Sequence, residues 1–252
     1  LYYPIKASVE SILPIVDEFV IALGKGDADD HTMEEIQKIK SNKIKIIHTE
    51  WDIEKYVGGG EYAHQTDIAK KHCKGNWLFY LQSDEVIHEK YLERIQKRCG
   101  ELLDNKDVEG LLFNYKHFWG DYAHYIISHA WYPKEIRIIR NNPEIHSWHD
   151  AQSFRRIPGF DGISYFQKEN TFKLKVAEVK AFKETHLAVM KDFIKKFNWN
   201  HQLYPQVKQI KKHKQDKLKY RMLSLIEQNI LKGNQIAGFK NYELIHPHIL
   251  RQ

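Results

Sequence analysis

Two adjacent acids, Asp84 and Glu85, follow a short apolar and aromatic segment of the chain. The segment Trp77–Leu81 comes after the turn-forming pair Gly75-Asn76, a pattern that predicts a buried strand. In open α/β sheets, ligands bind beyond the carboxyl ends of the strands. Paired carboxylates at that place suit a divalent cation, Mg²⁺ or Mn²⁺, and Mg²⁺ held in this way usually brings substrate phosphates with it. The alternative is a solvated turn, where acids are also common.

The elements that would position these acids alternate between helix and strand through the first half of the chain. Short strands separated by helices of about ten residues predict βαβ units and a parallel sheet. After Thr185 the sequence becomes helical and basic. The predicted strands are Glu18–Leu23, Ile44–His48, Trp77–Leu81, Gly110–Tyr115 and Glu135–Arg140, and the predicted helices are Lys6–Leu13, Met33–Lys40, Tyr62–Cys73 and Tyr91–Leu103.

These patterns predict an α/β fold with a mostly parallel central sheet flanked by helices. A length of 252 residues fits one large domain with an appendage, placed here at 1–188 and 189–252. The formal net charge of +6 favours anionic partners such as nucleotides, nucleic acid or an anionic membrane surface. The basic stretch Lys208–Arg221 lacks interleaved aromatic residues, which argues against nucleic acid. It reads as a solvated helix face or as a peripheral membrane contact.

The cellular location follows from what the sequence lacks. No apolar run is long enough to span a bilayer. Cys73 and Cys99 match neither a disulfide framework nor a zinc pattern, and we expect two reduced thiols in a cytoplasmic protein.

Four segments together carry a resemblance to a known family: Phe19–Thr32, Lys45–Trp51, Gln65–Glu85 and Glu135–Ala151. In their order and spacing the chain resembles family 2 glycosyltransferases, which have the GT-A fold and use nucleotide-sugar donors. The chain opens with Leu1 in mid-pattern. Compared with the family, this start implies that the first strand, together with any targeting signal, is absent from this sequence.

The resemblance assigns roles on the donor side. In the family an acid after an early strand contacts the base or ribose of the nucleotide, and Asp27, Asp29 and Asp30 lie in that loop. The alternative for Asp29 or Asp30 is helix capping. The family's metal motif is an acid, any residue, then an acid. Here Gln82-Ser83-Asp84 departs from it, because an amide replaces the first acid. Gln82 and Ser83 are expected beside the donor, and the metal is expected on Asp84, with Glu85 and His186 as further ligands.

The resemblance also implies an acceptor side built after the later strands. Asp150 fits the order of the family's catalytic base, a carboxylate that takes the proton of the acceptor hydroxyl. The alternatives are a turn residue or a partner of Arg155. Trp119, Asp121 and His149 are expected near the acceptor, since aromatic faces suit sugars. A buried aromatic patch covering the sheet is the competing interpretation.

The predicted function is transfer of a sugar from a nucleotide-diphosphate donor to a hydroxyl of a saccharide, lipid or protein, with inversion and metal assistance. The alternative is a non-catalytic nucleotide- or glycan-binding protein on the same fold, because fold does not fix function. A third class, nucleotidyl transfer, would need a glycine-rich phosphate loop near the N-terminus, and the sequence shows none.

Overall fold

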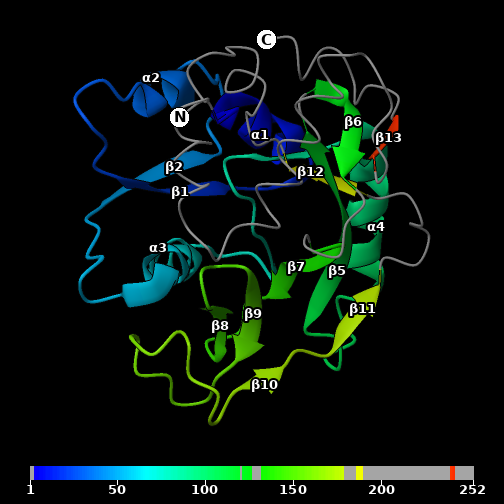
Figure 1. Cartoon of the computed structure of the whole chain (residues 1–252). Helices are drawn as coiled ribbons and strands as arrows, with labels where there is room; N and C mark the ends of the chain where they lie inside the picture. The colour runs from blue at the N-terminus through cyan, green and yellow to red at the C-terminus, as the bar shows by residue number, and fades with distance from the viewer. Residues whose placement is uncertain (1–2, 120, 127–131, 179–185, 190–238, 242–252) are drawn as a thin grey trace.

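The computed structural model describes residues 3–119, 121–126, 132–178, 186–189 and 239–241 (Figure 1). Within these residues helices are few, and they lie mainly in the first hundred positions. The α-helices are α1 (Ile5–Ile12), α2 (Thr32–Gln37), α3 (Gly60–Lys71) and α4 (Leu92–Glu101), and the 3-10 turns are η1 (Leu13–Ile15), η2 (Val57–Gly59) and η3 (Glu89–Tyr91).

The strands of the described residues form three sheets. A two-stranded parallel sheet contains β1 (Phe19–Gly24) and β2 (Ile44–Thr49). A small antiparallel sheet contains β8 (Ile145–Trp148), β9 (Ser153–Arg156) and β10 (Phe172–Lys173). The eight-stranded sheet contains β3 (Trp77–Phe79), β4 (Glu85–Ile87), β5 (Gly110–Trp119), β6 (Asp121–Ile126), β7 (Lys134–Arg140), β11 (Val176–Glu178), β12 (His186–Val189) and β13 (Phe239–Asn241).

The mixed α/β class is confirmed, but the prediction of a mostly parallel central sheet is wrong. Within the described residues, five of the seven pairings in the large sheet are antiparallel. A parallel connection needs a crossover of a dozen or more residues, usually a helix. One residue separates β5 from β6, so these strands must form a hairpin. The β1–α2–β2 unit does have the predicted parallel crossover.

The two-stranded sheet and the large sheet begin close together, although no described strand of one pairs with a described strand of the other. Glu18, which precedes β1, accepts a hydrogen bond from the backbone N–H of Lys74, which precedes β3. Among the described residues, β1 pairs with β2 alone and β3 pairs with β7 alone. Each of these two strands therefore has one edge without a described strand partner.

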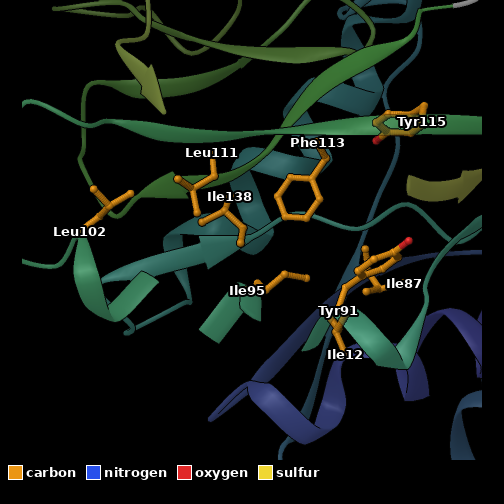
Figure 2. Packing of buried hydrophobic residues seen from close by; sticks show 9 residues of the cluster. All are labelled: Ile12, Ile87, Tyr91, Ile95, Leu102, Leu111, Phe113, Tyr115 and Ile138. Carbon is orange, nitrogen blue, oxygen red and sulfur yellow. The ribbon is translucent and has the colours of Figure 1, made fainter. Parts of the chain in front are cut away.

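The core lies between α1, α4 and one face of the large sheet (Figure 2). Alternate residues of β5 point to this face, because successive side chains of a strand point to opposite sides. Figure 2 shows Phe113 and Ile138 directed toward Ile95 of α4. A second cluster takes the opposite side of β3, where Leu78 packs with Ile139 and Phe154.

Two further predictions concern the membrane and the C-terminal segment. No helix among the described residues is long and apolar enough to cross a membrane. Most of the predicted basic helix at 189–252, including 208–221, lies outside the described residues. The described part of that segment is strand: Val189 ends β12, and Phe239–Asn241 forms β13 beside β6.

The cysteines agree with the sequence prediction in being free. Cys73 and Cys99 are both free and partly buried. Burial raises the pKa of each thiol to about 11.

Candidate functional site

The loops that follow β1 and β2 meet through a close approach of an aromatic ring to a glycine. A Cβ on Gly24 would lie 2.3 Å from Nε1 of Trp51, so a side chain at this position would displace the indole. The Trp51 ring also meets Tyr62 of α3 edge-on, with centroids 5.3 Å apart. Both rings stay about half exposed, at 46% for Trp51 and 54% for Tyr62. They form an aromatic surface at the carboxyl ends of these two strands.

A buried carboxylate fixes the loop after β2 to α3. Glu61 accepts hydrogen bonds from the backbone N–H of Asp52 at 3.2 Å and from Nε2 of Gln65 at 2.6 Å. Gln65 Nε2 also donates to the carbonyl of Glu50 at 3.0 Å. Because Glu61 and Gln65 are buried, these bonds are shielded from water and hold Trp51 in place against α3.

Asp150 lies against the glycine turn at the start of α3. Gly58 and Gly59 have φ values of 66° and 90°, a region that suits glycine. A Cβ on Gly59 would lie 2.9 Å from Cβ of Asp150 and 3.7 Å from the ring of Tyr62. The turn therefore brings Asp150, which is exposed, to the edge of the aromatic surface.

The turn that carries Asp150 has an unusual backbone. His149 and Ala151, on either side of it, have φ values of 59° and 61°. The left-handed region costs a residue other than glycine about 1–2 kcal/mol. Such strain persists only where the surroundings hold it. Here Ala151 is fully buried, and the His149 ring stacks on Phe166 with centroids 4.7 Å apart.

Asp84 lies in the turn between β3 and β4. It follows β3, as predicted, and is 7% exposed. Burial raises the pKa of Tyr3, and the Asp84 carboxylate and the Tyr62 phenol raise it further. Tyr3 is therefore close to both residues. The Asp84 carboxylate therefore lies within electrostatic range of Tyr3, while Asp150 lies against Gly59 beside Tyr62.

Glu85 does not face this region, although the sequence placed it beside Asp84 as a metal ligand. It is fully buried and pairs with Arg137, whose Nη2 lies 2.8 Å from Oε1 and whose Nε lies 3.0 Å from Oε2. The Tyr115 hydroxyl donates to Oε1 at 2.8 Å. Burial acts against the charge of Arg137, yet Glu85 and the neighbouring tyrosines together raise its pKa. Because Glu85 begins strand β4, alternation turns its side chain into the core.

The other predicted donor-side residues have local partners. Asp30 accepts hydrogen bonds from the backbone N–H of Thr32 at 2.9 Å and from its hydroxyl at 2.6 Å, which fixes the turn that leads into α2. The N-cap position of α2 is His31, so the capping alternative for Asp29 or Asp30 is not what the structure shows. The hydroxyl hydrogen bond first, and then the backbone one, lower the pKa of Asp30. Asp27 and Asp29 are exposed in the same loop.

The turn before Asp84 makes contacts of its own. Gln82 donates from Nε2 to the Tyr80 hydroxyl at 3.0 Å, and its carbonyl accepts from Ser8 at 3.0 Å. Ser83 is half-buried in the same turn.

Three predicted residues have described backbones only. Trp119 and Asp121 face each other across the β5–β6 hairpin, and His186 opens β12 opposite Asn114 of β5. The side chains of Trp119, Asp121 and His186 lie outside the described part of the structure. Among the side chains that are described, no group of three or more His, Cys, Asp or Glu residues could hold a metal ion.

The sequence prediction did not single out the two exposed rings, Trp51 and Tyr62. Their signal was present, because an aromatic residue just beyond an apolar strand lies where ligands bind in α/β sheets. Comparison of the chain with protein-family models and with curated proteins finds no match.

Proposed function

We propose that this chain transfers a sugar from a nucleotide-diphosphate donor to an acceptor hydroxyl. One observation carries the proposal: Asp150 lies against the glycine turn beside Tyr62, at the edge of the exposed aromatic surface that Trp51 and Tyr62 form beyond β1 and β2. A transfer reaction needs one group near the leaving diphosphate and another near the attacking hydroxyl. Two carboxylates from different segments, Asp84 after β3 and Asp150 after β8, suit that division.

The donor is proposed to lie on the Asp84 side. The exposed face of Trp51 offers a stacking surface for a nucleobase, at the end of the sheet where Gly24 begins the acidic loop. Asp27 and Asp29 are exposed in that loop and can accept hydrogen bonds from ribose hydroxyls. Asp30 contributes by holding the start of α2.

The acceptor is proposed to lie on the Asp150 side. Asp150 takes the proton of the acceptor hydroxyl as that oxygen attacks the anomeric carbon. The bond between this carbon and the diphosphate breaks, and the diphosphate leaves with the bonding electrons. Partial burial lowers the pKa of His149, so its imidazole is neutral near pH 7.

The residues supply only part of a metal site. Asp84 is the residue proposed to hold the cation, since Mg²⁺ is commonly held by one or two carboxylates together with substrate phosphates. A cation bound there would neutralise charge on the diphosphate. The roles of Asp150, Trp51 and Tyr62 do not depend on it.

A panel of UDP-, GDP- and dTDP-sugars, titrated by calorimetry with and without Mn²⁺, tests the donor proposal. At least one donor should bind, and replacing Trp51 by Ala should weaken that binding about tenfold, the equivalent of one lost aromatic contact. Phe172→Ala is the matched control, because Phe172 is similarly exposed at 47% but lies on β10. Absence of binding to every donor would reject the proposal.

Binding without transfer is the second candidate function. The observation that favours it is the absence of a multi-ligand metal group among the described side chains, with Glu85 taken up by Arg137. Release of free nucleoside diphosphate separates the two candidates. A donor that binds but is not consumed in the presence of varied sugar acceptors would support the binding protein.

A further inference from the structure

Asp67 of α3 is a buried carboxylate that has no part in the proposed reaction. It is 4% exposed. Its Oδ1 accepts a hydrogen bond from the backbone N–H of Ser147 at 2.9 Å, and its Oδ2 accepts one from Nδ1 of His146 at 2.9 Å. Both partners belong to β8, the strand that leads into the turn at Asp150. Asp67 thus ties α3 to the entry of that turn.

A second set of contacts, through Tyr165, connects Asp67 to the same turn. The Tyr165 hydroxyl donates to Oδ2 of Asp67 at 3.4 Å. The backbone carbonyl of Tyr165 accepts a hydrogen bond from the N–H of His149 at 2.9 Å. Tyr165 also packs in one buried cluster with Ala151, the residue that closes the turn. One carboxylate therefore holds the strand before Asp150 and the segment that supports it.

We propose that Asp67 is a positioning residue for the proposed base, an inference that rests on the role given to Asp150. His149 and Ala151 have left-handed backbones, which relax unless their surroundings hold them. Loss of the Asp67 contacts would free β8 and Tyr165 together. The turn would then relax and move Asp150 away from Gly59 and the acceptor. Asp67 acts through Asp150 and does not touch the substrates.

The test compares Asp67→Asn with a matched buried carboxylate elsewhere. Glu109 is 6% exposed and also accepts one hydrogen bond from a side-chain nitrogen and one from a backbone N–H, those of Arg156 at 2.9 Å and Lys175 at 2.8 Å. Glu109→Gln therefore controls for the loss of a buried charge and its hydrogen bonds. Donor affinity, kcat and the melting temperature are measured for the parent and both variants.

A positioning role predicts a loss of turnover without a loss of donor binding. Since a misplacement of about 1 Å can cost about 10²-fold in rate, kcat of Asp67→Asn should fall by about 10- to 100-fold. Donor affinity should stay within about twofold of the parent. Combining Asp67→Asn with Asp150→Asn should give a rate no lower than Asp150→Asn alone, because the first change acts through the second. Parent kcat in Asp67→Asn, or fully multiplicative effects in the pair, would overturn the inference.

Hydrogen exchange at the backbone N–H of His149 gives a readout that does not need activity. Asp67 does not touch this N–H, so a merely local loss would leave it protected. Asp67→Asn should speed its exchange by about tenfold or more, whereas Glu109→Gln should not. Unchanged exchange at His149 would refute the positioning role. If the parent transfers no sugar, the proposed function fails, and this exchange measurement still decides whether Asp67 holds the turn.

Discussion

Replacement of Glu85 by Gln separates a structural role from the metal-ligand role that the sequence suggested. The change keeps the shape of the side chain but leaves the guanidinium of Arg137, 0% exposed, without its counter-charge. Breaking a buried ion pair by removing one partner costs about 3–5 kcal/mol. The carboxylate also accepts hydrogen bonds from Tyr115 at 2.8 Å and from the backbone N–H of Gln82 at 3.2 Å. We therefore expect a loss of about 4 kcal/mol, a large part of the usual 5–15 kcal/mol of folding stability.

Urea unfolding followed by tryptophan fluorescence measures this loss. With a slope of about 2 kcal/mol per M, the midpoint should fall by about 2 M. Glu101→Gln is the control, since Glu101 forms an exposed pair with Arg98 and should change stability by less than about 1 kcal/mol. The double replacement Glu85→Leu with Arg137→Met should recover most of the loss, because it leaves no unpaired buried charge. A parent midpoint for Glu85→Gln, with loss of Mn²⁺-dependent donor binding, would refute the structural reasoning.

Three other substitutions or reactions test separate parts of the structure. Gly59→Ala places a side chain at φ 90°, so it should cost about 1–2 kcal/mol of folding stability and lower turnover. The control Gly100→Ala, which has open space around it, should stabilise α4 by about 0.5–1 kcal/mol. Unfolding curves and initial rates check both variants, and a stable, fully active Gly59→Ala would contradict the close contact between Gly59 and Asp150. Ser147→Ala should leave the free energy of unfolding unchanged or raise it by about 1 kcal/mol, since the buried Ser147 hydroxyl has no hydrogen-bond partner among the described residues. A clear fall in the urea midpoint would show that this hydroxyl does have a partner. Alkylation of Cys73 and Cys99 at pH 8 should be about 100-fold slower than alkylation of a free thiol, because a pKa of about 11 lowers the thiolate population by that factor. Rates equal to that of a free thiol would show that the two cysteines are more accessible than the structure has them.

The sequence predicted the early elements well because their signals are local. The apolar run at Phe19–Leu23 and the helical spacing before Cys73 both correspond to observed elements, β1 and α3, within a few residues. Turn residues such as Gly24 and Gly75 end or precede these runs, so their boundaries are visible in the chain itself.

The sheet directions could not be predicted in the same way. Whether β7 pairs with β3 and β5 in an antiparallel sense depends on distant partners, which a periodic pattern does not encode. The βαβ rule was extended to strands that are joined by short hairpins, and it failed there. The position of Glu85 was missed for a related reason. Only the partner Arg137, far along the chain, shows that this acid belongs to the core.

The candidate site was predicted in part. Asp84 follows its strand as expected, and Asp150 lies against the glycine turn at Gly59, beside Tyr62. The supporting residues were missed, because the contacts of Asp67 with β8 join residues about eighty positions apart. Such contacts arise from packing and leave no local pattern.

Donor affinity measured beside turnover, for Asp84→Ala and Asp150→Asn, tests the central claim most directly. Asp84→Ala should weaken donor binding, because it removes the carboxylate on the donor side. Asp150→Asn should bind the donor as the parent does, while turnover falls by about 10²–10⁴-fold, the usual effect of losing a general base. Sugar transfer at the parent rate by Asp150→Asn, or unchanged donor binding by Asp84→Ala, would contradict the proposed division between the two carboxylates.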